Sequence, residues 1–248
     1  MSSLTANLFG PPRIELDGVV LDLDHRKPLA LLIYLMVTAA PHSREALAAF
    51  FWPDYANARN YLRNNLSIIR HALGDNYGHW VSIDRQTVAW RDPDDAWVDV
   101  CEFERHLVAW RAYGHASDDL RPSRRAALSD AVALAADDFL GGFTLRDSPL
   151  FDEWSYFQRE RLRGETTGAL DALAGAYASG GDLDAAIAHA RRRLALDNLH
   201  EPAHRQLMAL YAQKGQRALA LRQYEACAQV LRTEFDVAPS GETRALFE

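Results

Sequence analysis

The sequence predicts a mainly α-helical protein with small antiparallel sheets near its N-terminus and helical repeats towards its C-terminus. Short alternating strands open and close the first hundred residues, helical segments lie between them, and residues 165–233 repeat with a period of 34. The chain has 248 residues, of which 48% are hydrophobic and 25% charged. This composition is typical of a globular protein of two domains, and it excludes disorder and a disulfide-bonded mini-protein.

The first elements are a hairpin and two helices. Residues 13–21 alternate apolar and charged side chains around Asp17-Gly18, a pair that favours a two-residue hairpin turn. An apolar helical segment follows between Pro28, which suits the start of a helix, and Pro41, which ends it. Ser43 is expected to cap a second helix over 44–51, because serine side chains accept hydrogen bonds from free N–H groups at helix starts.

A third helix is predicted over residues 57–73, and its two faces differ. At 100° per residue the buried stripe consists of Leu62, Leu66, Ile69 and Leu73. The opposite arc holds Asn60, Arg63, Asn64, Ser67 and His71, and one flank holds Arg59 and Arg70. The segment contains no Asp or Glu. Arginine forks pair with guanine edges or phosphates and asparagine pairs with adenine, so this face suits a DNA major groove. A solvated face of a structural helix is the alternative interpretation.

Residues 81–90 predict a second hairpin, whose polar tip carries Arg85. A sheet, three helices and a terminal hairpin follow one another in a winged helix-turn-helix. In that fold the last helix contacts bases, and the hairpin, called the wing, contacts phosphates or the minor groove. We therefore expect base contacts from Asn60, Arg63, Asn64, Ser67 and His71, and phosphate or wing contacts from Arg59, Arg70 and Arg85.

The net charge limits where nucleic acid can bind. The chain carries a formal charge of −7, and residues 1–100 contain nine Lys or Arg against twelve Asp or Glu. A protein that coats nucleic acid through bulk positive charge is therefore excluded. Binding is expected to be confined to the third helix and the second hairpin.

The Asp- and Pro-rich segment 92–97 is interpreted as a junction without regular structure, which separates a domain at 1–95 from one at 98–248. Asp99 is expected to cap a helix, a second helix is expected from Pro122 to Phe139, and a long one starts at Ser148-Pro149. In the repeats that follow, Tyr177 aligns with Tyr211 and Gly181 with Gly215, both 34 residues apart. This period is typical of tetratricopeptide-like helical repeats, which present surfaces to partners.

Several motifs resemble the OmpR-type winged helix of the SARP family of bacterial transcriptional activators. They are Ser43-Arg44-Glu45-Ala46-Leu47, Phe51-Trp52-Pro53, Ala58-Arg59-Asn60 and Ala72-Leu73-Gly74. One departure is Ile68, because that family commonly has a basic residue at this position. Further motifs resemble the bacterial transcriptional activation domain that follows this winged helix in the family. They are Phe139-Leu140-Gly141-Gly142, Phe151-Asp152-Glu153-Trp154, Glu160-Arg161-Leu162-Arg163 and Pro239-Ser240-Gly241-Glu242-Thr243-Arg244.

The resemblance implies a sequence-specific DNA-binding activator whose second domain supports self-association and contacts RNA polymerase. We expect a homodimer on repeated half-sites of promoter DNA, about 10–11 base pairs apart. A different class remains open: a tetratricopeptide-like interaction scaffold, or the N-terminal part of a larger multidomain regulator, without strong DNA binding of its own.

One motif indicates enzymatic chemistry. His200-Glu201-Pro202-Ala203-His204 matches the zinc-peptidase pattern H-E-x-x-H, but Pro202 places it at a helix start, where the two histidines are not held within a helix interior. We therefore expect no enzyme activity, no metal and no cofactor. Neither a targeting segment nor a membrane-spanning run is evident, and a cytoplasmic location is expected.

Overall fold

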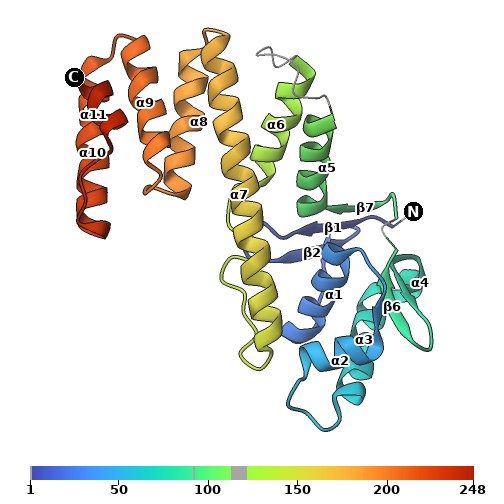
Figure 1. The fold of residues 1–248 in the computed structure, drawn as a ribbon. Coiled ribbons are helices and arrows are strands. Elements are labelled where there is room, and N and C mark those ends of the chain that lie inside the picture. The colour runs from blue at the N-terminus through green and yellow to red at the C-terminus, as the bar shows by residue number, and fades with distance from the viewer. Residues whose placement is uncertain (1, 92, 113–121) are drawn as a thin grey trace. The chain divides into compact units, whose positions relative to one another are not determined.

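The computed structural model describes residues 2–91, 93–112 and 122–248, and it is mainly helical (Figure 1). Its contacts divide the chain into two compact units. Unit 1 comprises Met1–Arg105 and Leu134–Leu162, and unit 2 comprises His106–Ala133 and Arg163–Glu248. Helices α5 (Asp99–Ala112) and α7 (Pro149–Ser179) contribute residues to both units. Residue 92 of the predicted junction lies outside the described residues.

A four-stranded sheet in unit 1 has the strand order β3-β2-β1-β7. Its strands are β1 (Leu4–Asn7), β2 (Arg13–Leu16), β3 (Val19–Val20) and β7 (Ala96–Val98). The first predicted hairpin is confirmed, because β2 and β3 pair in antiparallel fashion around Asp17 and Gly18. Both turn residues have positive φ, 53° and 78°, as a type I′ turn requires.

Strand β7 corrects the prediction of a junction without regular structure. Ala96–Val98 pairs in parallel with β1, so that Leu4 lies opposite Ala96. The next residue, Asp99, is only 4% exposed, and its carboxylate accepts hydrogen bonds from the N–H groups of Leu8 at 2.7 Å and Phe9 at 2.9 Å. The Asp99 carboxylate also accepts the N–H of Val100. Asp99 therefore connects the start of α5 to the segment that follows β1.

Three helices and a second sheet complete the first hundred residues. The helices are α1 (Arg26–Thr38), α2 (Arg44–Phe51) and α3 (Ala58–Leu73), followed by the short η1 (Gly74–Asn76) and α4 (Tyr77–Trp80). The second sheet has the order β4-β6-β5, with strands β4 (His42–Ser43), β5 (Val81–Ile83) and β6 (Thr87–Trp90). Ser43 caps α2 as predicted, since its Oγ accepts the N–H of Ala46 at 3.0 Å. The second predicted hairpin, β5–β6, is also confirmed.

The later segment of unit 1, residues 134–162, packs against α1 and α2 through aromatic side chains. Phe151 is fully buried, with its ring centroid 5.6 Å from that of Phe51. The ring centroids of Trp154 and Tyr34 are 5.0 Å apart. The compact unit that holds α3 therefore contains a segment far from it in the sequence.

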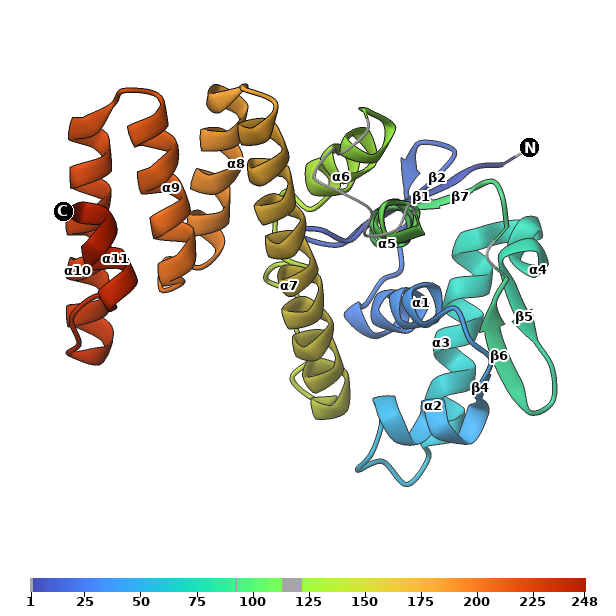
Figure 2. The same ribbon diagram turned by 45° about the horizontal axis from the view of Figure 1, so that its top comes forward.

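Unit 2 is built from helices and ends in a stack of consecutive ones (Figure 2). Its elements, apart from parts of α5 and α7, are α6 (Pro122–Leu134), α8 (Leu183–Leu196), α9 (Glu201–Gln213), α10 (Arg217–Phe235) and α11 (Gly241–Phe247). Helix α6 ends at Leu134 rather than at Phe139, because the chain then turns and Phe139 forms a β-bridge with Phe9.

The period of 34 is confirmed by equivalent bonds in the two repeats. Gly181 and Gly215 have φ of 81° and 75°. The N–H of Asp182 binds the carbonyl of Tyr177 at 2.9 Å, and the N–H of Gln216 binds the carbonyl of Tyr211 at 2.8 Å. The same turn therefore connects α7 to α8 and α9 to α10.

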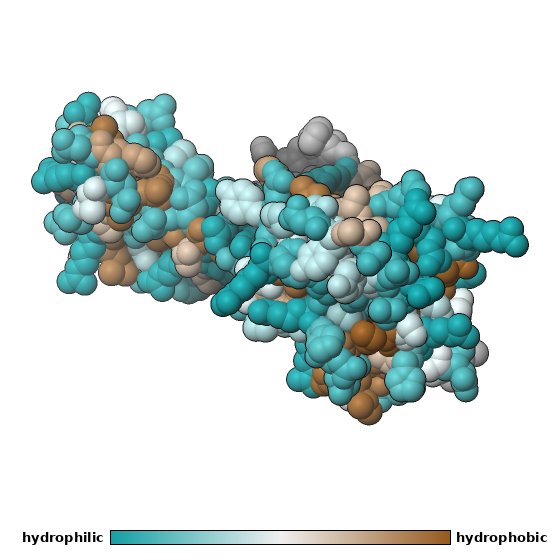
Figure 3. All heavy atoms as spheres, turned by 90° about the horizontal axis from the view of Figure 1, so that it is seen from below, coloured by the Kyte–Doolittle hydropathy of each residue, from teal (hydrophilic) through white to brown (hydrophobic). Residues whose placement is uncertain are grey.

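The face of the protein seen in Figure 3 is mostly polar. On the face seen in Figure 3, apolar residues form small separate groups among hydrophilic ones. Within the described ranges, no helix has both the length and the apolar character needed to cross a membrane.

Candidate nucleic-acid interface

Helix α3 has the two faces that its sequence predicts. Leu62, Leu66, Ile69 and Leu73 are all buried, at 4% exposure or less. The seven predicted contact residues on this helix are all exposed: Arg59, Asn60, Arg63, Asn64, Ser67, Arg70 and His71. The helix is therefore held by its apolar stripe and leaves its polar face free.

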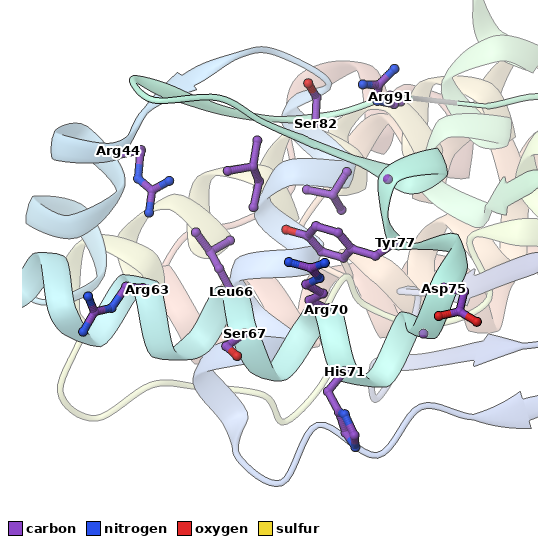
Figure 4. A pocket seen from close by; sticks show the side chains of 14 residues that line it. Arg44, Arg63, Leu66, Ser67, Arg70, His71, Asp75, Tyr77, Ser82 and Arg91 are labelled. Atoms are coloured by element: carbon purple, nitrogen blue, oxygen red, sulfur yellow. The ribbon is translucent and has the colours of Figure 1, made fainter.

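A groove of about 970 Å³ lies between α3 and the β5–β6 hairpin (Figure 4). Four arginines line it: Arg44, Arg63, Arg70 and Arg91. Among the described residues that line it, Asp75 is the one carboxylate. In Figure 4, Arg70 points from α3 toward the hairpin, whereas His71 points to the other side of the helix. The groove thus concentrates positive charge in a protein whose net charge is −7.

Two of these arginines, Arg44 and Arg91, were not among the predicted contact residues. Arg44 is the first residue of α2, and the pairing of β4 with β6 brings it beside the hairpin. Its N–H binds the carbonyl of Gln86 at 2.8 Å, and its guanidinium binds the carbonyl of Asp84 at 3.4 Å. Arg91 directly follows β6. No local pattern distinguishes these two arginines, because only the sheet pairing places them near α3.

Tyr77 lies beneath the arginines and remains uncharged at neutral pH. Burial raises the pKa of its phenol to about 12, although Arg70 and Arg44 act in the opposite direction. The buried ring therefore supports the groove without reducing its positive charge.

The hairpin tip is held by Asp84 and carries Arg85. The Asp84 carboxylate accepts the N–H groups of Gln86 at 2.7 Å and Thr87 at 2.6 Å, and the Thr87 hydroxyl at 2.8 Å. These hydrogen bonds, first of all that from the Thr87 N–H, lower the pKa of Asp84, because they stabilise its ionised carboxylate. Arg85 is exposed on this turn, outside the residues that line the groove.

The remaining predicted residues lie elsewhere on α3. Arg59 forms an ion pair with Glu45 of α2, so its charge is partly compensated. Asn60 is exposed near the start of the helix and lines neither of the grooves beside it. Asn64 lines a second groove, of about 900 Å³, on the flank away from the hairpin. Of the eight predicted residues, the structure brings Arg63, Ser67, Arg70 and His71 together in the arginine-lined groove.

The H-E-x-x-H motif has an internal role in unit 2. His204 is 4% exposed, its Nε2 lies 2.8 Å from the carbonyl oxygen of Asn198, and its Nδ1 lies 2.6 Å from the side-chain amide of Gln223. A carboxylate oxygen of Glu201 accepts the N–H of Ser240 at 2.7 Å. Both ring nitrogens of His204 are thus occupied by protein partners. In the part of the chain that the structure describes, no group of three or more His, Cys, Asp or Glu could hold a metal ion.

Comparisons with known proteins extend these observations. The family model of the bacterial transcriptional activator domain matches residues 98–248. Among solved structures, one described as Mycobacterium tuberculosis EmbR in complex with low affinity phosphopeptide is similar, with a TM-score of 0.76 and 22% sequence identity. The match covers 100% of this chain and 64% of the EmbR chain, so this chain spans less than two thirds of that one.

No curated protein matches the chain. The likeness to EmbR shows the fold, and the family model identifies the activator domain that the motifs between Phe139 and Arg244 indicate. The resemblance to the SARP-family activators is thereby confirmed. The chain belongs to the family of bacterial transcriptional activators that carry this domain.

Proposed function

We propose that this protein is a sequence-specific DNA-binding transcriptional activator that reads promoter DNA with α3 and holds the duplex with the β5–β6 hairpin. The observation that carries the proposal is the groove between these two elements, which four arginines line in a protein of net charge −7. The order of sheet, three helices and hairpin, which is that of a winged helix, supports it.

The residues divide by role. Arg63, Asn64 and Ser67 are the proposed base contacts, because they are exposed on the middle of α3 and carry groups that match base edges. Arg44, Arg70 and Arg91 line the side of the groove that phosphates would follow. The wing contact is Arg85. Arg59 is the weakest candidate, since binding phosphate would compete with its ion pair to Glu45.

A single winged helix contacts a short site, so specific binding requires two protomers on repeated half-sites about one helical turn of DNA apart. We propose that the activator domain pairs the protomers and contacts RNA polymerase in the cytoplasm. Membership of the activator family supports this part of the proposal.

Selection of bound sequences from a random pool of DNA duplexes tests the proposal. We expect one repeated motif to be enriched, and Arg63→Ala to weaken binding to it by about 1–3 kcal/mol while relaxing preference at one base pair. Arg70→Ala should instead weaken binding to all sequences alike. Arg232→Ala, which removes an exposed arginine of unit 2, is the matched control and should leave binding unchanged.

A salt titration separates this function from that of a protein-interaction scaffold. Binding that depends mainly on phosphate contacts weakens steeply as the salt concentration rises, because such binding releases counterions from the duplex and this release is less favourable at high salt. Failure to enrich any sequence, together with no salt-dependent DNA binding, would refute the proposed function.

A further inference from the structure

The two flanks of α3 carry opposite charge. The flank toward the hairpin is lined by four arginines and one aspartate. The second groove, on the other flank, is lined by Asp22 and Asp24, and the described part of the chain contributes no Lys or Arg to it. Ser67 and His71 line both grooves, so they form the ridge between them. Both flanks belong to unit 1.

The two aspartates are held in place by the chain that follows β3. The N–H of Asp24 binds Oδ1 of Asp22 at 3.1 Å, and Asp24 has a positive φ of 53°, a conformation that Asp and Asn tolerate better than most residues. Both residues are exposed, and neither forms an ion pair with another described residue. No ion pair among the described residues therefore neutralises their negative charges, which lie beside the polar face of α3.

We propose that Asp22 and Asp24 are specificity-determining residues that keep DNA phosphates away from this flank of α3. This inference rests on the proposed function, because it describes how the duplex is oriented on the same helix. A phosphate placed in the second groove would face two carboxylates and no cation from Lys or Arg, whereas a phosphate on the opposite flank would meet four guanidinium groups.

Repulsion of this kind acts mainly on wrong binding modes. Like charges that approach each other at an interface make the binding free energy of that binding mode less favourable. Specificity depends on the difference in binding free energy between competing modes. Other positions of the duplex, in which the backbone crosses the β3 side, are disfavoured. Asp22 and Asp24 thus raise the ratio of specific to non-specific binding without touching a base.

The double variant Asp22→Asn/Asp24→Asn tests the inference in the full chain. Asparagine keeps the shape of the turn, and it tolerates the positive φ at position 24. The matched control is Glu234→Gln/Asp236→Asn at the end of α10, which changes the net charge equally and also alters an aspartate of positive φ, 55°. Binding is measured against the duplex selected by the unaltered protein and against a scrambled duplex of the same length.

We expect the double variant to bind the scrambled duplex roughly fivefold more tightly, with a smaller change for the selected duplex. The slope of log affinity against log salt for the scrambled duplex should steepen by about 1 for each additional phosphate contacted. The single variant Asp24→Asn, which retains the Asp22 side chain that holds the turn, should show part of the effect.

An unchanged ratio of specific to non-specific affinity, or a ratio that changes as much in the α10 control, overturns the inference. Equal weakening toward both duplexes also overturns it, because it indicates a structural role. These outcomes require that the unaltered protein binds its selected duplex, so they are distinct from failure of the proposed function, in which the unaltered protein selects no sequence.

Discussion

The two compact units are stabilised by contacts of different range. In unit 2, α9 packs against α8 and α10, its neighbours along the chain. In unit 1, the central contacts join residues far apart in sequence: the rings of Phe51 and Phe151 pack together, and the Lys27 ammonium lies 2.8 Å from the Asp147 carboxylate. The stack α8–α9–α10 of unit 2 thus has the nearest-neighbour character of helical repeats, whereas the packing of unit 1 depends on contacts between distant segments.

This difference has a consequence for the candidate interface. Helix α3 and the arginine-lined groove belong to unit 1, and so do residues 134–162, which fall within the match to the activator domain. Lys27 also lies over the rings of Trp52 and Tyr55, at 5.1 Å and 5.3 Å from their centroids. The loop that leads into α3 is therefore connected to the activator-domain segment, and substitutions in that segment should affect the stability of unit 1.

The largest effect is expected for Phe151→Ala. Phe151 is fully buried and contacts the rings of Phe51, Phe143 and Trp154, so its removal leaves a cavity between distant segments of unit 1. The free energy of unfolding should fall by about 3–5 kcal/mol. Urea denaturation followed by tryptophan fluorescence measures this free energy.

Phe157→Ala, on the same helix but 60% exposed, is the control and should change the free energy of unfolding by no more than about 0.5 kcal/mol. Similar decreases in the free energy of unfolding for the two variants would contradict a stabilising role of the contacts between distant segments.

The second effect concerns the equivalent turns of unit 2. Gly181→Ala and Gly215→Ala place a Cβ at positive φ, where the space around both residues is otherwise open. Each variant should be destabilised by about 1–2 kcal/mol, the cost of the left-handed conformation for a residue with a side chain.

Gly175→Ala, in the interior of α7 with open space around it, is the matched control. It should instead be stabilised by up to about 1 kcal/mol, because alanine favours helix more than glycine does. Urea denaturation of the three variants checks the series. Clearly unequal losses at 181 and 215 would show that the two repeats are not energetically equivalent.

Helix caps should behave alike in both units, because they act locally. Ser43 caps α2 of unit 1, and the Asp182 carboxylate caps α8 of unit 2 by accepting the N–H of Ala185 at 3.1 Å. Ser43→Ala and Asp182→Ala should each cost about 1 kcal/mol of unfolding free energy. Asn57→Ala provides the comparison, since Asn57 precedes α3 without a side-chain capping bond and should matter less. Thermal unfolding with reversible refolding measures all three.

The smallest effect is a dependence on pH from one histidine in each unit. Burial lowers the pKa of His42 in unit 1, and burial followed by the charge of Arg192 lowers the pKa of His189 in unit 2. A pKa below the unfolded value of about 6.5 means that stability is fully present above that pH and is lost as the pH falls through the folded pKa. Between pH 7 and pH 5, Tm should therefore fall. Differential scanning calorimetry should show a smaller fall in His42→Gln and in His189→Gln. A fall unaltered by either substitution would assign the pH dependence to other groups.

The sequence by itself determined the features that depend on neighbouring residues. The amphipathic pattern of 57–73 predicted the buried stripe of α3, Asp17-Gly18 predicted the first turn, and the period of 34 predicted the matching turns at Gly181 and Gly215. Each of these rests on helical periodicity or on the φ that a turn requires, and both are local properties of the chain.

Only the tertiary structure decided what surrounds α3. Arg44 and Arg91 enter the groove because β4 pairs with β6, and Asp22 and Asp24 line the other flank because the chain after β3 lies beside the helix. Strand β7 likewise forms only because β1, ninety residues earlier, is available to pair with it. Such pairings bring together residues that are far apart in the sequence, and the residues next to them in the chain do not predict the contact. The reason is that the pairings are stabilised by burial and hydrogen bonding between distant segments.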